Sequence, residues 1–211
     1  MSFFKKALYV VFAFVLIQTA SAQNFSLELA TMMPLSGNNS LTGLGKGGSI
    51  GYQTDVSYNV RVRANFEVQF FQGSKNSLLS YGSHWENWPQ ETIYEIKNTI
   101  INMRYSEISL GYDYFLFKMK PNMYIGPDLF VAQSTANYQR TSEYQNNQDV
   151  AIAFTAGLKV HYGIEKKVKK MTLFGEYTAA FAAHTPYIGI DPDAKLIRLG
   201  LNHQFGLGFR F

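Results

Sequence analysis

The segment Ile197–Phe211, IRLGLNHQFGLGFRF, alternates between two kinds of residue. Its odd-numbered positions carry large apolar side chains, apart from His203, and its even-numbered positions carry glycine, an amide or arginine. Successive side chains of a β-strand point to opposite faces, so the segment predicts a long strand with one apolar face and one polar face. Strands of soluble β-sandwiches also alternate, but they seldom place so many large apolar groups on one face over such a length.

The same alternation recurs upstream. In Val60–Phe70, apolar residues alternate with Arg61, Arg63 and Glu67, among others. Three segments alternate less cleanly, and one of them contains Pro127, which cannot donate a backbone hydrogen bond and predicts a bulge or an edge-like break. The pattern as a whole predicts eight strands: Phe25–Met33, Ser49–Tyr58, Val60–Phe70, Glu107–Leu116, Asn122–Gln133, Val150–Tyr162, Thr172–Ala183 and Ile197–Phe211.

The connections between these predicted strands alternate in length. Three are short: Tyr58–Asn59, Phe117–Pro121 and Glu165–Lys170. Four are long and polar: Ser36–Gly47, Gln72–Thr99, Ser134–Asp149 and His184–Ala194. Short turns at one end and long loops at the other are typical of a transmembrane up-and-down barrel. We therefore expect an all-β fold: a closed antiparallel barrel with one face toward lipid and the other filling a narrow lumen.

The composition is consistent with a barrel of this kind. Charged residues make up 16% of the chain, against about 25% in soluble domains, and aromatic residues also make up 16%. The mean hydropathy of −0.12 argues against a helical membrane protein, which needs several apolar runs of about 20 residues. The many aromatic residues argue against disorder. The absence of cysteine excludes disulfides and thiolate zinc sites.

The first 22 residues have the features of a secretory signal peptide. Lys5 and Lys6 precede an apolar run, Ala7–Ile17, and Ala20-Ser21-Ala22 forms a small-residue cleavage site before Gln23. The apolar run is short for a membrane anchor. Cleavage between Ala22 and Gln23 leaves residues 23–211 as a single barrel domain. Without the two leader lysines, 17 basic residues face 15 acidic ones, so we expect no nucleic-acid partner.

By these features the chain resembles the small eight-stranded outer-membrane barrels of Gram-negative bacteria, of the OmpA and OmpX type. The resemblance is most specific in the last strand, where Phe205, Leu207, Phe209 and Phe211 alternate up to a terminal phenylalanine. In that family this pattern is the signal read by the barrel-assembly machinery. The resemblance implies an outer-membrane location, and contact with outer-membrane lipid and lipopolysaccharide.

Charged residues of both signs fall on the predicted lumen face. They could form an ion path or an acid–base site, but buried charges must pair and the lumen is narrow, which favours a salt-bridged plug. We name as the lumen network Arg61, Arg63, Glu67, Glu107, Asp113, Lys159, Glu176 and Arg198. Further charged or titratable residues on the same predicted face are Glu28, Asp55, Asp128, His161 and Arg210.

No enzyme site can be assembled from the sequence. The four histidines, His84, His161, His184 and His203, are scattered, and no His-x-Ser pair like that of acyl-cleaving barrels occurs. The histidines are also too far apart to suggest a metal site. We therefore expect neither enzymatic activity nor a cofactor.

The second predicted loop holds the aromatic residues Tyr81, Trp85, Trp88 and Tyr94. They could belong to an interfacial girdle, or they could form a contact surface for a partner. The leading hypothesis is a non-enzymatic barrel with a structural or surface-interaction role through its four outer loops. A narrow channel and an accessory subunit of a larger outer-membrane complex are the alternatives.

Overall fold

The computed structural model describes residues 25–35, 42–74, 77–87, 90–117, 121–144, 146–184 and 198–211. The predicted signal peptide, with its cleavage site between Ala22 and Gln23, lies outside these residues. In the described ranges, no helix is long and apolar enough to cross a membrane. These ranges contain nine strands: β1 (Phe25–Leu35), β2 (Thr42–Ser57), β3 (Val60–Gly73), β4 (Ser77–Asn87), β5 (Gln90–Phe117), β6 (Asn122–Thr141), β7 (Asn146–Val168), β8 (Met171–His184) and β9 (Arg198–Arg210).

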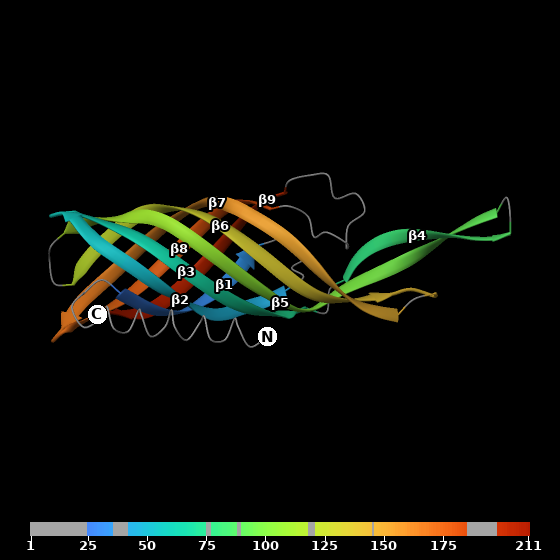
Figure 1. Ribbon diagram of the computed structural model, residues 1–211, viewed down its shortest axis with the longest axis horizontal. Coiled ribbons are helices and arrows are strands. Elements are labelled where there is room, and N and C mark those ends of the chain that lie inside the picture. The colour runs from blue at the N-terminus through green and yellow to red at the C-terminus, as the bar shows by residue number, and fades with distance from the viewer. Residues whose placement is uncertain are drawn as a thin grey trace, which may run out of the picture.

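Eight of the strands close into a ring. Neighbours along the chain pair antiparallel from β1 to β3 and from β5 to β9. The ring is completed where β3 pairs directly with β5 and β9 pairs with β1. The strands wind obliquely around a common axis, with β4 outside the ring (Figure 1). This arrangement confirms the predicted closed, antiparallel, up-and-down barrel of eight strands.

The register of the ladders fixes the tilt of the strands. One circuit of paired residues starts at Phe25 and ends at Leu35 of the same strand, passing through Tyr52, Ala64, Leu110, Leu129, Leu158, Phe181 and Leu201. The circuit therefore advances ten residues, from 25 to 35, around eight strands. For that stagger, the strands tilt by about 40° from the barrel axis. The interior of a barrel of this size is just wide enough for side chains to fill.

The two faces of the sheet differ as the alternation predicts. On the outside, Leu29, Leu129 and Leu207 are 75%, 69% and 73% exposed, within a belt of exposed aliphatic and aromatic side chains. On the inside, Glu107 and Lys159 are buried. A contiguous apolar belt of this extent is unfavourable in water but is well solvated by lipid tails. The outer surface is therefore that of a membrane-spanning barrel.

The prediction that Gln72–Thr99 forms a loop is wrong. Most of it forms a β-hairpin, in which β4 pairs with the first part of β5, from Ser77↔Thr99 to Asn87↔Gln90. This hairpin projects away from the end of the barrel (Figure 1). We define this end of the molecule as the hairpin end. A two-stranded ribbon in water has no buried face, so its sequence lacks the apolar–polar alternation that identified the other strands.

The predicted connections Ser134–Asp149 and Glu165–Lys170 are also shorter than expected. Strand β6 continues to Thr141 and β7 begins at Asn146, so most of the third loop is paired strand. At the opposite end of the barrel, Val168 pairs with Met171, which leaves a two-residue turn, Lys169-Lys170. We call this opposite end, where β1 begins and β9 finishes, the turn end.

Pro127 does not produce a bulge. The register between β6 and β7 runs unbroken through Pro127↔Val160. Against β5, pairing at Gly111↔Asp128 resumes at Tyr114↔Ile125 without a change of register. The missing N–H of proline therefore interrupts the ladder on one side only, and the strand keeps its inward and outward faces.

Candidate functional site: the filled lumen and the projecting hairpin

Arg63 lies at the centre of the lumen and contacts carboxylates from three other strands. Its Nη2 atom is 2.5 Å from Oδ2 of Asp128 on β6, and its Nη1 atom is 2.7 Å from Oε2 of Glu176 on β8. Asp113 on β5 lies 3.6 Å from the same Nη1 atom. The Arg63 side chain is only 6% exposed. A planar guanidinium can bridge several carboxylates with oriented hydrogen bonds, which makes it well suited to join strands across a narrow barrel.

His161 on β7 adds a second link between two of these carboxylates. Its Nε2 atom lies 2.9 Å from Oδ1 of Asp113, and its Nδ1 atom lies 3.5 Å from Oδ2 of Asp128. The imidazole is fully buried.

Tyr124 donates its hydroxyl hydrogen to Glu176 over 3.0 Å. The Tyr124 ring reaches over Gly163 of the neighbouring strand, where a Cβ atom would lie 2.1 Å from the ring. Gly163 is therefore needed for this close approach.

Lys159 forms the next layer toward the hairpin end. Its ammonium group pairs with Glu107 and lies 3.4 Å from Glu67. Each carboxylate has a further partner: Tyr105 donates to Glu107 over 2.7 Å, and Gln69 donates to Glu67 over 2.7 Å. The layer is thus a buried network of one ammonium, two carboxylates and two neutral donors.

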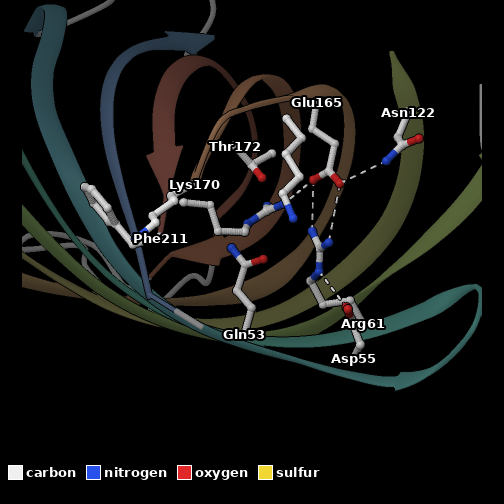
Figure 2. A pocket seen from close by; sticks show the side chains of 10 residues that line it. Gln53, Asp55, Arg61, Asn122, Glu165, Lys170, Thr172 and Phe211 are labelled. Atoms are coloured by element: carbon white, nitrogen blue, oxygen red, sulfur yellow. Dashed lines mark hydrogen bonds and ion pairs between the residues drawn. The ribbon is translucent and has the colours of Figure 1, made fainter. Parts of the chain in front are cut away.

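A third layer closes the turn end of the lumen. Arg61 lies 3.0 Å from Asp55 and 3.0 Å from Glu165, and Arg210 pairs with the same Glu165 carboxylate. Asn122 donates to Glu165 over 3.4 Å. Figure 2 shows Glu165 between Asn122 and Arg61, with Asp55 beyond. Glu165 was missed as a lumen residue because the sequence assigned it to a turn, although it shares the odd-numbered face of Lys159 and His161.

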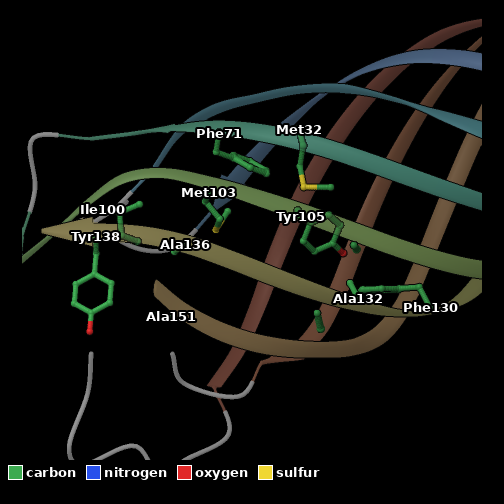
Figure 3. Close-up of a cluster of buried hydrophobic side chains, with 12 residues drawn as sticks. Met32, Phe71, Ile100, Met103, Tyr105, Phe130, Ala132, Ala136, Tyr138 and Ala151 are labelled. Atoms are coloured by element: carbon green, nitrogen blue, oxygen red, sulfur yellow. The ribbon is translucent and has the colours of Figure 1, made fainter. Parts of the chain in front are cut away.

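Apolar side chains fill the lumen toward the hairpin end (Figure 3). The buried cluster consists of Met32, Phe71, Ile100, Met103, Tyr105, Phe130, Ala132, Ala136, Tyr138, Ala151, Ala180 and Ala182. Tyr105 joins the two regions, because its ring belongs to the cluster while its hydroxyl group binds Glu107. An ion crossing the barrel would have to break a paired network and then pass an apolar layer.

The predicted lumen residues are therefore brought together, with one exception. Arg61, Arg63, Glu67, Glu107, Asp113, Lys159 and Glu176 all take part in the paired layers. The side chain of Arg198 lies outside the described part of the structure. In that described part, no cluster of three or more histidine, aspartate or glutamate side chains could hold a metal ion.

Three of the four predicted contact residues, Tyr81, Trp85 and Tyr94, fall on the projecting hairpin. Tyr81 pairs with Glu95 in the ladder, and Trp85 pairs with Glu91, but their side chains lie outside the described part of the structure. Trp88 is not among the described residues. The Tyr94 ring packs edge-on against Tyr144, with ring centroids 5.0 Å apart, which ties the hairpin to the β6–β7 turn.

The predicted assembly strand occupies the outer face of β9 and the residue after it. Phe205, Leu207, Phe209 and Phe211 are all exposed on this face. The role of these residues as an assembly signal stays a prediction. His203 on the same strand is partly buried, because its ring stacks on Tyr177 and its Nδ1 atom hydrogen-bonds the Tyr177 hydroxyl group.

Comparison with solved structures identifies the fold. Neisserial surface protein A superposes with a TM-score of 0.51 at 12% sequence identity, covering 90% of this chain and 96% of that one. The chain has the fold of the small eight-stranded outer-membrane β-barrels. Two further outer-membrane barrels align with TM-scores below 0.5. Ail of Yersinia pestis gives 0.44 at 13% identity over 89% of this chain and 97% of that one. The N-terminal barrel domain of Pseudomonas aeruginosa OprF gives 0.39 at 12% identity over 90% and 98%.

No protein-family model and no curated protein matches the sequence. The likeness of this outer-membrane barrel to known proteins is therefore found by comparing structures and not by comparing sequences. The apolar belt and the barrel fold together indicate the outer membrane as its location. At 12–13% identity these likenesses show the fold and do not choose a role.

Proposed function

We propose that the protein is a non-enzymatic outer-membrane barrel that contacts a partner polypeptide at the cell surface through the β4–β5 hairpin. The observation that carries this proposal is the position of β4 at the end of the strand order. Among the described strands it pairs with β5 alone, so its other edge is open along Ser77–Asn87. An open edge offers backbone N–H and C=O groups to an extended segment of another chain.

The sequence of β4 supports such pairing. Edge strands that must avoid other chains usually carry proline, lysine or a bulge. The segment SLLSYGSHWEN has no proline and no lysine, and its only formal charge is on Glu86. The one irregularity of its ladder lies close to the tip, between Trp85 and Asn87. Most of the edge is therefore left without these protective features.

The orientation in the membrane supports a surface role. With an even number of strands in the ring, β1 begins and β9 finishes at the same end, and in barrels of this architecture the short turns face the periplasm. The Tyr58–Asn59 and Lys169-Lys170 turns then lie in the periplasm, and the hairpin extends outside the cell. Lipopolysaccharide would surround the belt in the outer leaflet.

Photo-crosslinking in the native membrane tests the contact. A photoreactive phenylalanine analogue replacing Leu79 on β4 is expected to give a discrete protein adduct, whereas the same analogue replacing the lipid-facing Leu129 is expected to give none. A shortened chain that joins Ser80 to Ile96 through Asn-Gly keeps the base of the hairpin, because these two residues pair and a two-residue Asn-Gly turn fits such a ladder. The adduct at Leu79 should disappear in that chain. Equal labelling at Leu129 would instead point to an accessory subunit docked on the belt.

The filled lumen argues against the channel alternative. We expect purified wild-type barrel, folded and inserted in planar bilayers, to give no discrete conductance steps, because ion pairs and an apolar cluster occupy the lumen. Single-channel recording at both polarities checks this expectation. Reproducible steps from wild-type protein that shows a heat-modifiable band would favour transport over surface contact.

The histidines give no support to an enzymatic role. His161 is fully buried between two carboxylates, and His203 bonds Tyr177 on the lipid-facing side. Within the described part of the structure, neither histidine hydrogen-bonds a serine hydroxyl group that it could activate. The side chains of His84 and His184 lie outside the described part of the structure.

A further inference from the structure

Four lysines surround the β7–β8 turn, and the turn geometry separates them into two pairs. Val168↔Met171 is the last pair of the ladder, and Lys169 takes a left-handed conformation with φ of 57°. Odd-numbered residues of β7 and even-numbered residues of β8 face the lumen side of the sheet, so Lys167 and Lys170 stand over the mouth of the barrel. The other pair, Lys166 and Lys169, does not line the small cavity at that mouth, although Lys166 borders a neighbouring, more open pocket that Lys167 also lines.

The mouth holds a small cavity of about 210 Å³ (Figure 2). The charged side chains that line it are Asp55, Arg61, Glu165, Lys167, Lys170 and Arg210. Three neutral polar side chains, including the Thr172 hydroxyl group, complete its polar wall. Sites for drug-sized ligands are usually larger, at about 300–1,000 Å³. The cavity therefore suits a single small group.

The charges of this cavity do not balance. Glu165 is already bound by Arg61 and Arg210, and Asp55 is bound by Arg61. Lys167 and Lys170 are exposed, and neither forms an ion pair with another described residue. Arg61 also lies 3.6 Å from the buried carboxylate of Asp113, so both arginines of the cavity have carboxylate partners. The positive charges left without a side-chain carboxylate are those of the two lysines at the entrance.

We propose that this cavity at the turn end binds a phosphomonoester group. A phosphomonoester carries about −1.5 to −2 charges at neutral pH and three acceptor oxygens, which complements two lysines and the Thr172 hydroxyl donor. Lysine binds phosphate as a compact point charge, and its flexible stem lets two lysines close on one group. The group could come from a small soluble phosphate ester or from a lipid headgroup in the periplasmic leaflet. The surface-contact proposal does not depend on this site.

Two arms of one experiment distinguish the sources. The full barrel in a maltoside detergent, which contains no phosphate, is titrated with glycerol 3-phosphate and followed by ³¹P NMR. The same protein in nanodiscs of phosphatidylcholine, with or without phosphatidic acid, is treated with an amine-acetylating reagent and examined by mass spectrometry. Saturable binding in the first arm identifies a soluble ester. Protection of Lys167 and Lys170 only with phosphatidic acid identifies a lipid headgroup.

Two double variants with the same change of charge separate this site from general attraction to a basic rim. The variant K167Q/K170Q is expected to weaken binding at least tenfold, whereas K166Q/K169Q should leave the affinity within about twofold. All four lysines are exposed, so both variants should fold, and a heat-modifiable band checks that they do. Equal weakening by the two variants, or the absence of both binding and protection in the wild-type protein, would overturn the proposal.

Discussion

Replacing Arg63 with methionine is expected to lower the free energy of unfolding by about 3–5 kcal/mol. The guanidinium group of Arg63 is buried against Asp113, Asp128 and Glu176. Its removal leaves these buried carboxylates repelling one another without the cation that compensates their charge. Urea titration of the barrel in lipid vesicles, followed by far-UV circular dichroism, measures the loss. Tryptophan fluorescence is unsuitable, because Trp85 lies on the projecting hairpin and the only other tryptophan of the sequence, Trp88, is not among the described residues.

Two further variants test whether the loss comes from the network. Arg104 is exposed on the outer face, four residues nearer the hairpin end than Ile108, and for such a position near the interface Arg104→Met is expected to change stability by no more than about 1 kcal/mol. Adding Glu176→Gln to Arg63→Met should recover part of the loss, because it removes one of the unpaired charges. A loss below about 1 kcal/mol for Arg63→Met would show that the network contributes little to stability.

Replacing Phe66 with arginine is expected to destabilise the barrel by about 2–4 kcal/mol. Phe66 is half exposed on the outer face of β3, and its paired neighbours Ile50 and Ile108 are also exposed there. Such a position lies in hydrocarbon if the belt spans the membrane, and a guanidinium there loses its hydration. The same urea titration measures the effect.

The matched control for this prediction lies at the turn end. Tyr58 is 78% exposed in the β2–β3 turn, and Tyr58→Arg should have an effect of about 0–1 kcal/mol because interfacial positions are hydrated. Equal effects at the two sites would mean that the outer face is not in contact with lipid. A larger effect at Tyr58 than at Phe66 would mean that the turn end, and not the position of Phe66, lies in the hydrocarbon.

Alternation predicted the ring because each of its strands lies between two different solvents. The odd-numbered face of β9 and the even-numbered face of β3 were both assigned to lipid, and both lie outside. The same rule could not find β4, since the projecting hairpin has water on both faces. It also ended β7 too early, because beyond Tyr162 the strand approaches the turn end and includes several lysines.

The pairing of charges in the lumen could not be read from the sequence. Parity indicates that Arg63 and Glu176 face inward, but it does not say that they meet across the barrel. Their contact depends on the stagger of the strands, which only the complete set of registers defines. Glu165 shows the other limit, because its role depends on Arg61 and Arg210, which come from distant parts of the chain.

The ladder between β1 and β9 also constrains how the chain can fold. Ser26 pairs with Arg210, so the first described strand gains its second neighbour only when the last strand is in place. Until then β1 and β8 both have an open edge, and the contacts that close the ring have a very large sequence separation, which slows folding. Closure must therefore be a late event, and a chain arrested before β9 would be a sheet with open edges at β1 and β8, in addition to that of β4, rather than a smaller barrel.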